Sequence, residues 1–209
     1  NVENSKIFLK NYLLGDEEIK RTLIKKFKHN GIKENRVVIK KETKSRKESL
    51  EMYNEIDIAL DTFPYNGVTT SHEAILMGVP VLTKKGERPH SKMGESLNSN
   101  IGMTEWIAEN DKDYIYKATK FGKNIPKLSK IRKELDAACF IAYDISIEDA
   151  NYILFNTFPL LRGSDEKQNA GKFQYGLDVV MLMQKFLDGD SAIEWLDSPV
   201  ANGWLPKSI

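Results

Sequence analysis

The polar residues with the clearest chemical potential lie in the segment 60–81. Within it, Asn66-Gly67 is predicted to form a turn, because both residue types tolerate positive φ. A helix is predicted to begin at Thr69-Thr70. The free backbone N–H groups at a helix start, with two hydroxyls beside them, form an anion site suited to a phosphate.

Glu73 lies one helical turn beyond Thr69, on the same face of the predicted helix. A carboxylate there could accept hydrogen bonds from a ribose diol while the helix start holds phosphates. A simpler interpretation also fits these residues. Thr-Thr before a helix is an ordinary N-cap, and Glu73 matches the capping-box spacing from Thr70. The residues alone therefore leave both nucleotide binding and plain helix capping open.

The residues around this segment alternate short apolar runs with helical patterns. Strands are predicted at residues 6–10, 36–39, 56–61 and 81–83, and helices at 17–30, 45–55, 69–77 and 91–100. This alternation predicts an α/β fold, a Rossmann-like doubly wound parallel sheet with helices on both faces. Ligands bind such sheets beyond the carboxyl ends of the strands, which places a site in the loops that follow them.

The pattern becomes helical towards the C-terminus. Helices are predicted at 111–121, 126–138 and 173–187, and a polar linker at 163–171. We therefore divide the chain into a Rossmann-like domain over residues 1–140 and a helical C-terminal extension over 141–209, whose role the sequence does not indicate. The chain begins at Asn1 without an initiator Met, so we expect a piece of a longer protein.

Composition excludes several classes of protein. Thirty-one Lys and Arg against thirty Asp and Glu give a net charge of +1, without the basic excess of a nucleic-acid binder. No apolar run is long enough for a membrane span. The single cysteine, Cys139, rules out an internal disulfide and fits a reducing compartment, so we expect a cytoplasmic protein. The scattered histidines and the cysteine offer no zinc site.

The motifs in this chain resemble those of glycosyltransferase family 41. The matching residues are Leu60-Asp61-Thr62, Pro64-Tyr65, Gly67, Thr69-Thr70, Glu73, Met77 to Thr83, Ser91 to Leu97, Gly102 to Ala108 and Tyr114 to Phe121. The family includes O-GlcNAc transferase, SPINDLY-type O-fucosyltransferases and bacterial cytoplasmic N-glycosyltransferases. The ordered resemblance covers about residues 5 to 136.

The resemblance implies the C-terminal, nucleotide-sugar-binding half of a GT-B glycosyltransferase, in which two Rossmann-like domains flank the active site. Such enzymes transfer a sugar from a donor such as UDP-GlcNAc to a protein or peptide, with inversion and without a metal. The family's catalytic lysine lies upstream of the strand at 6–10, as do the other Rossmann-like domain and, in many members, helical repeats. We therefore expect no catalytic residue, and no transferase activity, in this chain alone.

The resemblance also assigns residues to the donor site. Thr69 and Thr70 fall where the family's paired threonines hold the donor diphosphate, in the loop that contains Asn66 and Gly67. Glu73 falls where an acidic residue binds the ribose.

Three further positions depart from the family pattern. Val68 falls where O-GlcNAc transferase has a histidine near the phosphates. Arg46 and Ser49 fall where the family has a Lys-x-x-His pair near the ribose and base.

Two other functions fit the same motifs. One is another GT-B nucleotide-sugar enzyme of the epimerase type, and the other is a non-catalytic α/β interaction domain whose threonines only cap a helix. Within the family, UDP-GlcNAc, UDP-hexose and GDP-fucose donors all remain open, as does the acceptor.

Overall fold

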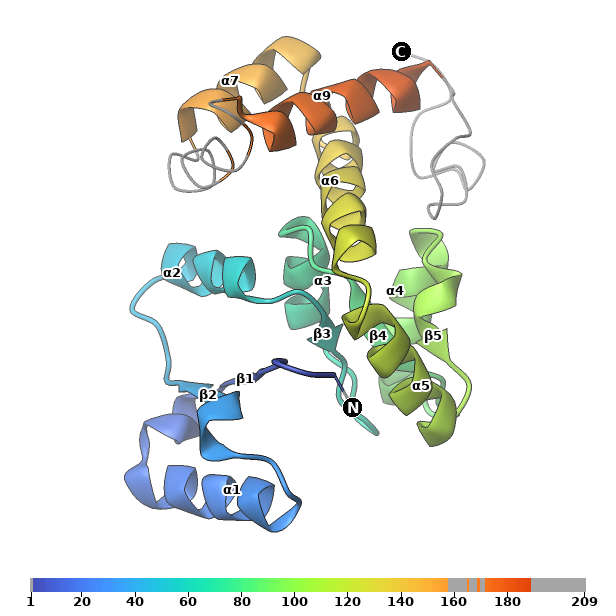
Figure 1. Cartoon of the computed structure of the whole chain (residues 1–209). Coiled ribbons are helices and arrows are strands. Elements are labelled where there is room, and N and C mark those ends of the chain that lie inside the picture. The colour runs from blue at the N-terminus through green and yellow to red at the C-terminus, as the bar shows by residue number, and fades with distance from the viewer. Residues whose placement is uncertain (1, 158–164, 166–168, 170–171, 189–209) are drawn as a thin grey trace. The chain divides into compact units, whose positions relative to one another are not determined.

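The computed structural model (Figure 1) describes residues 2–157, 165, 169 and 172–188. The chain divides into two compact units, Asn1–Asp57 and Ile58–Ile209, and each is described by itself. The predicted boundary at residue 140 stays a prediction, and most of the predicted linker at 163–171 lies outside the described residues.

The first unit is built on two parallel strands. Its elements are β1 (Ile7–Lys10), a 3-10 helix (Tyr12–Gly15), α1 (Glu17–His29), a 3-10 helix (Glu34–Arg36), β2 (Val37–Lys40), α2 (Arg46–Glu51) and a 3-10 helix (Met52–Glu55). Strand β1 pairs in parallel with β2. Asp16 caps α1 by accepting hydrogen bonds from the N–H groups of Glu18 (2.8 Å) and Ile19 (3.0 Å), as predicted. No side chain among residues 2–57 is fully buried, so this unit has little core of its own.

The second unit contains a three-stranded parallel sheet in the order β3-β4-β5. Its elements are β3 (Ala59–Leu60), α3 (Thr69–Leu76), β4 (Val81–Lys84), a 3-10 helix (Pro89–Ser91), α4 (Met93–Asn100), a 3-10 helix (Thr104–Trp106), β5 (Ile107–Ala108), α5 (Asp111–Gly122), α6 (Ile125–Ala142), α7 (Ile147–Thr157) and α9 (Gln174–Leu187). Parallel strands joined by helices confirm the predicted α/β class.

One predicted strand is wrong in length. Residues 56–61 were expected to be extended, but β3 covers only Ala59–Leu60. Its pairing with β4 begins where the N–H of Ala59 donates to the carbonyl of Pro80. Earlier residues would need partners in the turn before β4, where Gly78 has a φ of 70° and Pro80 lacks an N–H donor.

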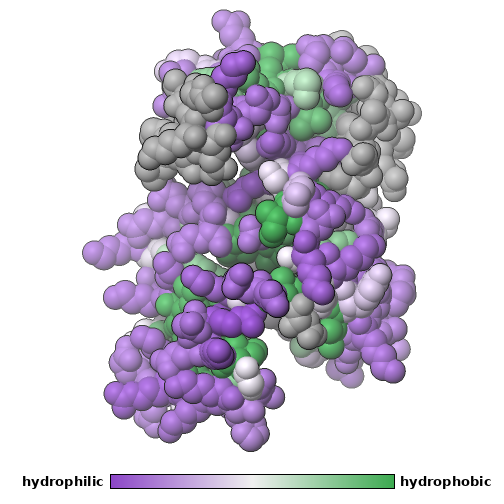
Figure 2. Space-filling model, in the orientation of Figure 1, coloured by the Kyte–Doolittle hydropathy of each residue, from purple (hydrophilic) through white to green (hydrophobic). Residues whose placement is uncertain are grey.

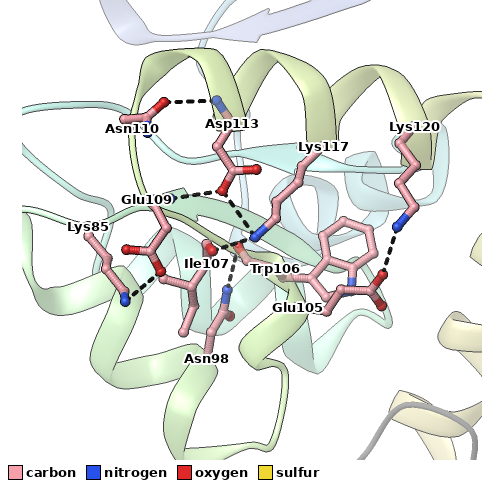
Figure 3. A network of polar contacts seen from close by, with 10 residues as sticks. All are labelled: Lys85, Asn98, Glu105, Trp106, Ile107, Glu109, Asn110, Asp113, Lys117 and Lys120. Atoms are coloured by element: carbon pink, nitrogen blue, oxygen red, sulfur yellow. Dashed lines mark hydrogen bonds and ion pairs between the residues drawn. The ribbon is translucent and has the colours of Figure 1, made fainter.

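A polar network fixes the helices beside β5 (Figure 3). The Asn98 amide donates to the carbonyl of Val81 in β4 (2.8 Å) and to the carbonyl of Trp106, just before β5 (3.3 Å). These bonds tie α4 to β4 and to the segment that leads into β5. Lys117 of α5 donates to the carbonyl of Ile107 (2.7 Å) and pairs with Asp113 (3.2 Å). The core below this network includes the stacked rings of Trp106 and Phe121 (4.2 Å between centroids).

The same network caps the N-terminus of α5 and continues along one side of this helix (Figure 3). The N-cap Asn110 accepts from the N–H of Asp113 (3.1 Å), and the Asp113 carboxylate accepts from the N–H of Glu109 (2.9 Å). Ion pairs join Lys85 to Glu109 (2.7 Å) and Lys120 to Glu105 (3.4 Å). These contacts fix the direction in which α5 leaves the sheet.

Hydrophilic side chains cover much of the face drawn in Figure 2. No helix in the described ranges is long and apolar enough to cross a membrane.

Helix α9 lies across the C-terminal half of α6, and α7 packs against α9 (Figure 1). Between α6 and α9, the Tyr175 hydroxyl donates to the Asp136 carboxylate (2.5 Å). Arg132 of α6 donates to the carbonyl of Met77 at the end of α3 (3.3 Å). A side chain at Gly78 would lie within 2.8 Å of Asp136. Helix α6 therefore braces the C-terminal end of α3.

Burial raises the pKa of Asp136 from 3.8 to about 6, although the Tyr175 hydroxyl and Arg132 lower it. A raised folded-state pKa stabilises the fold below pH 3.8 and loses that contribution as the pH rises through about 6. We expect Asp136→Asn, whose amide oxygen can still accept from Tyr175, to remove this loss. Its free energy of unfolding relative to wild type should rise between pH 4 and 6, by at most about 3 kcal/mol. Urea denaturation across this range measures the difference, and parallel pH profiles for the two chains would contradict the assignment.

Candidate functional site

The predicted anion site lies at the start of α3. Val68 is the N-cap residue, and Thr69 and Thr70 are the first two helical residues. The capping interpretation, with a threonine as N-cap, is therefore wrong in this form. A helix start leaves its first N–H groups without intrahelical acceptors, and Val68 has no side-chain oxygen to offer them. Both threonines are exposed, so the helix start can receive an external anion.

Gly67 is required by close packing and not by a turn conformation. The turn at Asn66-Gly67 was predicted because both residue types tolerate positive φ, but neither residue has a positive φ. A Cβ at Gly67 would lie 2.5 Å from the Thr70 hydroxyl and 2.7 Å from the Ser71 hydroxyl. The Ser71 hydroxyl also donates to the carbonyl of Gly67 (3.1 Å). A side chain at Gly67 would thus displace the first turn of α3.

Asn66 ties this loop to the next one. It is 2% exposed, and its amide donates to the carbonyl of Thr62 (2.9 Å). Its side-chain oxygen accepts from the N–H of Gly94 (3.3 Å), in the first turn of α4. Its own N–H donates to the carbonyl of His90 (3.0 Å). Asn66 therefore holds the loop after β3 against the segment after β4.

Aromatic side chains also lie in these two loops, which follow β3 and β4. Tyr65 is 70% exposed, and its ring stacks on that of His90 with 5.7 Å between centroids. Lys84 lies 3.4 Å from the centroid of the Phe63 ring and pairs with Asp111 (2.5 Å). Both strands that precede these loops end at the same edge of the sheet. Sequence reasoning did not bring these side chains together, because the pairing depends on which loops become neighbours.

The remaining predicted site residues fall into two groups. Glu73 is half-buried, one turn along α3 from Thr69. Arg46 and Ser49 belong to α2 of the first unit, where Ser49 accepts a hydrogen bond from Lys10. The predicted residues from Asn66 to Glu73 therefore lie together at the start of α3 in the second unit. Arg46 and Ser49 belong to the first unit.

Asp61 directly follows β3 and bonds to the loop before α3. Its carboxylate accepts from the N–H of Gly67 (2.8 Å) and from the hydroxyl of Thr83 (2.7 Å). Burial raises its pKa, against the lowering effect of these hydrogen bonds. Among the residues that the structure describes, no group of three or more His, Cys, Asp or Glu side chains could hold a metal ion.

Comparison with known proteins identifies the family. The family described as "Glycosyl transferase family 41" matches residues 1–142. The chain belongs to glycosyl transferase family 41. This confirms the resemblance drawn from the motifs between Leu60 and Phe121, and the match includes the complete helix start at Thr69.

Curated relatives in this family carry the name probable UDP-N-acetylglucosamine–peptide N-acetylglucosaminyltransferase SPINDLY. The protein from Eustoma exaltatum subsp. russellianum is 31% identical over 134 residues, which is 64% of this chain and 15% of the relative. The protein from Arabidopsis thaliana is 29% identical over 134 residues, with the same coverage. The chain thus spans about 15% of the length of these relatives.

A solved structure extends the likeness. A mutant of Thermobaculum terrenum O-GlcNAc transferase superposes with a TM-score of 0.62 at 27% identity, over 86% of this chain and 31% of that one. This family 41 structure confirms the predicted fold class. Its coverage exceeds the 142 residues that match the family, so the likeness in fold reaches into the C-terminal helices.

The buried Asn66 yields a stability prediction. Asn66→Ala should lower the free energy of unfolding by about 2–4 kcal/mol, because it leaves the Thr62 carbonyl and the Gly94 N–H without their partner. Urea denaturation measures the loss. The matched control is Asn100→Ala, since the exposed Asn100 amide donates only within its own helix, to Ser96. Equal losses in the two variants would contradict an anchoring role for Asn66.

Proposed function

We propose that this chain is the donor-binding part of a protein glycosyltransferase that takes its sugar from a nucleotide donor such as UDP-GlcNAc. The observation that carries the proposal is the exposed start of α3 at Thr69 and Thr70. It lies at the carboxyl edge of a parallel sheet, inside a match to family 41. The names of the relatives, which are peptide N-acetylglucosaminyltransferases, support a protein or peptide acceptor.

The chemistry of the helix start suits a diphosphate. The N–H groups of the first turn point out of the helix, and the helix dipole adds partial positive charge there. The hydroxyls of Thr69 and Thr70 add two further donors. As the sugar leaves the donor, negative charge grows on the diphosphate, and donors fixed in advance stabilise it without reorganisation.

Glu73 extends the same surface by one turn. A carboxylate accepts hydrogen bonds from both hydroxyls of a ribose diol, and it has no donor of its own when ionised. In this proposal the nucleoside lies along α3 from Glu73 towards the phosphates at Thr69. Arg46 and Ser49 are proposed to approach the ribose and base.

The transfer is proposed to proceed with inversion and without a metal, so protein groups must supply all the charge stabilisation. The catalytic lysine is proposed to lie in an upstream Rossmann-like domain of the longer protein, as are helical repeats that recognise the acceptor. The chain alone is then proposed to bind the donor without transferring sugar. A cytoplasmic location also stays a prediction.

Titration of the whole chain with UDP or GDP tests the phosphate site. We expect Thr69→Val to weaken nucleotide binding roughly tenfold or more, because it keeps the branched shape and deletes a donor to a charged group worth ~1.5–3 kcal/mol. The melting temperature should stay near that of wild type. Thr104→Val, at an exposed threonine of another helix start, is the matched control and should bind as wild type does. If Thr69→Val changes only the melting temperature, the chain is better explained as an interaction domain.

The ribose assignment has its own test. Glu73→Gln should lower affinity for UDP but leave affinity for inorganic pyrophosphate unchanged, because the carboxylate is assigned to the sugar hydroxyls. Isothermal titration with each compound gives the two constants, and Glu87→Gln at an exposed position serves as the control. An equal loss for both compounds would place Glu73 at the phosphates and contradict the assignment.

A further inference from the structure

We propose that Asp61 is the positioning residue of the donor site. Its carboxylate fixes the loop over residues 62–68, and through it the helix start at Thr69 and Thr70, relative to β4 and α4. This inference rests on the proposed function, because the site that Asp61 positions is the proposed phosphate site.

The first argument is that the two carboxylate oxygens join different elements. Asp61 is still tied to the sheet, since its N–H donates to the carbonyl of Leu82 (2.9 Å). One oxygen accepts from the N–H of Gly67, two residues before α3 (2.8 Å). The other accepts from the hydroxyl of Thr83, in the central strand β4 (2.7 Å). The loop is thus fastened to the sheet just before the helix begins.

The second argument is steric. A Cβ at Gly94, in the first turn of α4, would lie 2.3 Å from the Asp61 carboxylate and 2.1 Å from the Thr83 hydroxyl. Only glycine lets α4 approach this closely. The carbonyl of Asp61 also accepts from the hydroxyl of Tyr114 in α5 (3.0 Å). Asp61 therefore links two strands, β3 and β4, to the loop before α3 and to the helices α4 and α5.

The third argument is energetic. Burial of the Asp61 carboxyl raises its pKa, so keeping a charge there costs free energy that an apolar side chain would not. A carboxylate is the group that can accept a hydrogen bond at each oxygen with no proton of its own in the way. An asparagine could still accept from Gly67 but would direct its NH₂ group towards Thr83. An aspartate is therefore the residue type best suited to accept from both the Gly67 N–H and the Thr83 hydroxyl.

The arrangement also assigns the donors of the anion site. Because the Gly67 N–H is bound to Asp61, it is not offered to a phosphate. The proposed phosphate site then consists of the N–H groups and hydroxyls that follow Val68. Loss of the bridge between Gly67 and Thr83 should displace all of these groups. It should therefore weaken the binding of every ligand that carries a diphosphate, whatever its nucleoside.

The experiment titrates the whole chain with UDP and with inorganic pyrophosphate. We expect Asp61→Ala, Thr83→Val and Gly94→Ala each to lower the affinity for UDP and for pyrophosphate by the same factor, roughly tenfold or more. Asp61→Asn should lose less, and Thr83→Ser, which keeps the hydroxyl, should bind as wild type does. The equal factor separates Asp61 from Glu73, whose change should affect UDP alone.

A core variant separates positioning from stability. Met183→Ala removes a fully buried side chain of α9, away from the Asp61 contacts, and should lower the melting temperature at least as much as Thr83→Val, with unchanged affinity for both ligands. If Met183→Ala loses as much affinity as Asp61→Ala, or if Asp61→Ala binds as wild type does, the positioning proposal is overturned. If Asp61→Ala does not fold, the pair Thr83→Val and Thr83→Ser decides the question. A wild-type chain that binds neither ligand would instead overturn the proposed function itself.

Discussion

The parallel pairing of β3 with β4 is the constraint on which the rest of the candidate site depends. Ala59 lies opposite Val81 and Leu60 opposite Leu82, so both strands end at the same edge, with Asp61 beside Thr83. A shift of one residue would turn each side chain to the other face of the sheet. Asp61 could then bond neither to Thr83 nor to the loop before α3. The chemistry proposed for the helix start thus begins with the alignment of two short strands.

Much of this arrangement could be predicted from local sequence. The alternation of apolar runs and helical patterns gave the α/β class, and Asp16, Gly31 and Thr69 marked helix ends that the structure confirms to within about a residue. These signals are local, because a cap or a helix start depends on residues within one turn. Strand β3 was predicted too long, at residues 56–61, because its length depends on which residues of its partner strand can pair with it.

The contacts that hold the candidate site together could not be predicted from residue types and spacing. Asn66 and Gly67 were predicted from turn preferences, yet Asn66 is buried between two loops and Gly67 avoids a collision with Thr70. The close approach of Gly94 to Asp61 joins residues that are distant in sequence. Such contacts depend on which loops become neighbours in the fold, and neither residue type nor spacing encodes that directly. The motif resemblance, which the family match confirms, pointed to this segment without indicating these contacts.

The packing of α6 has a consequence for how the protein can be divided. The family match ends at residue 142, which is the last residue of α6. Yet α9, which follows residue 142, is the main neighbour of α6, and several apolar side chains of both helices are fully buried. A recombinant chain that stopped at 142 would lack α9 and expose to water the part of α6 that α9 covers, and exposed apolar surface of this kind drives self-association. The boundary at which related sequences stop matching is therefore a poor place to cut this molecule.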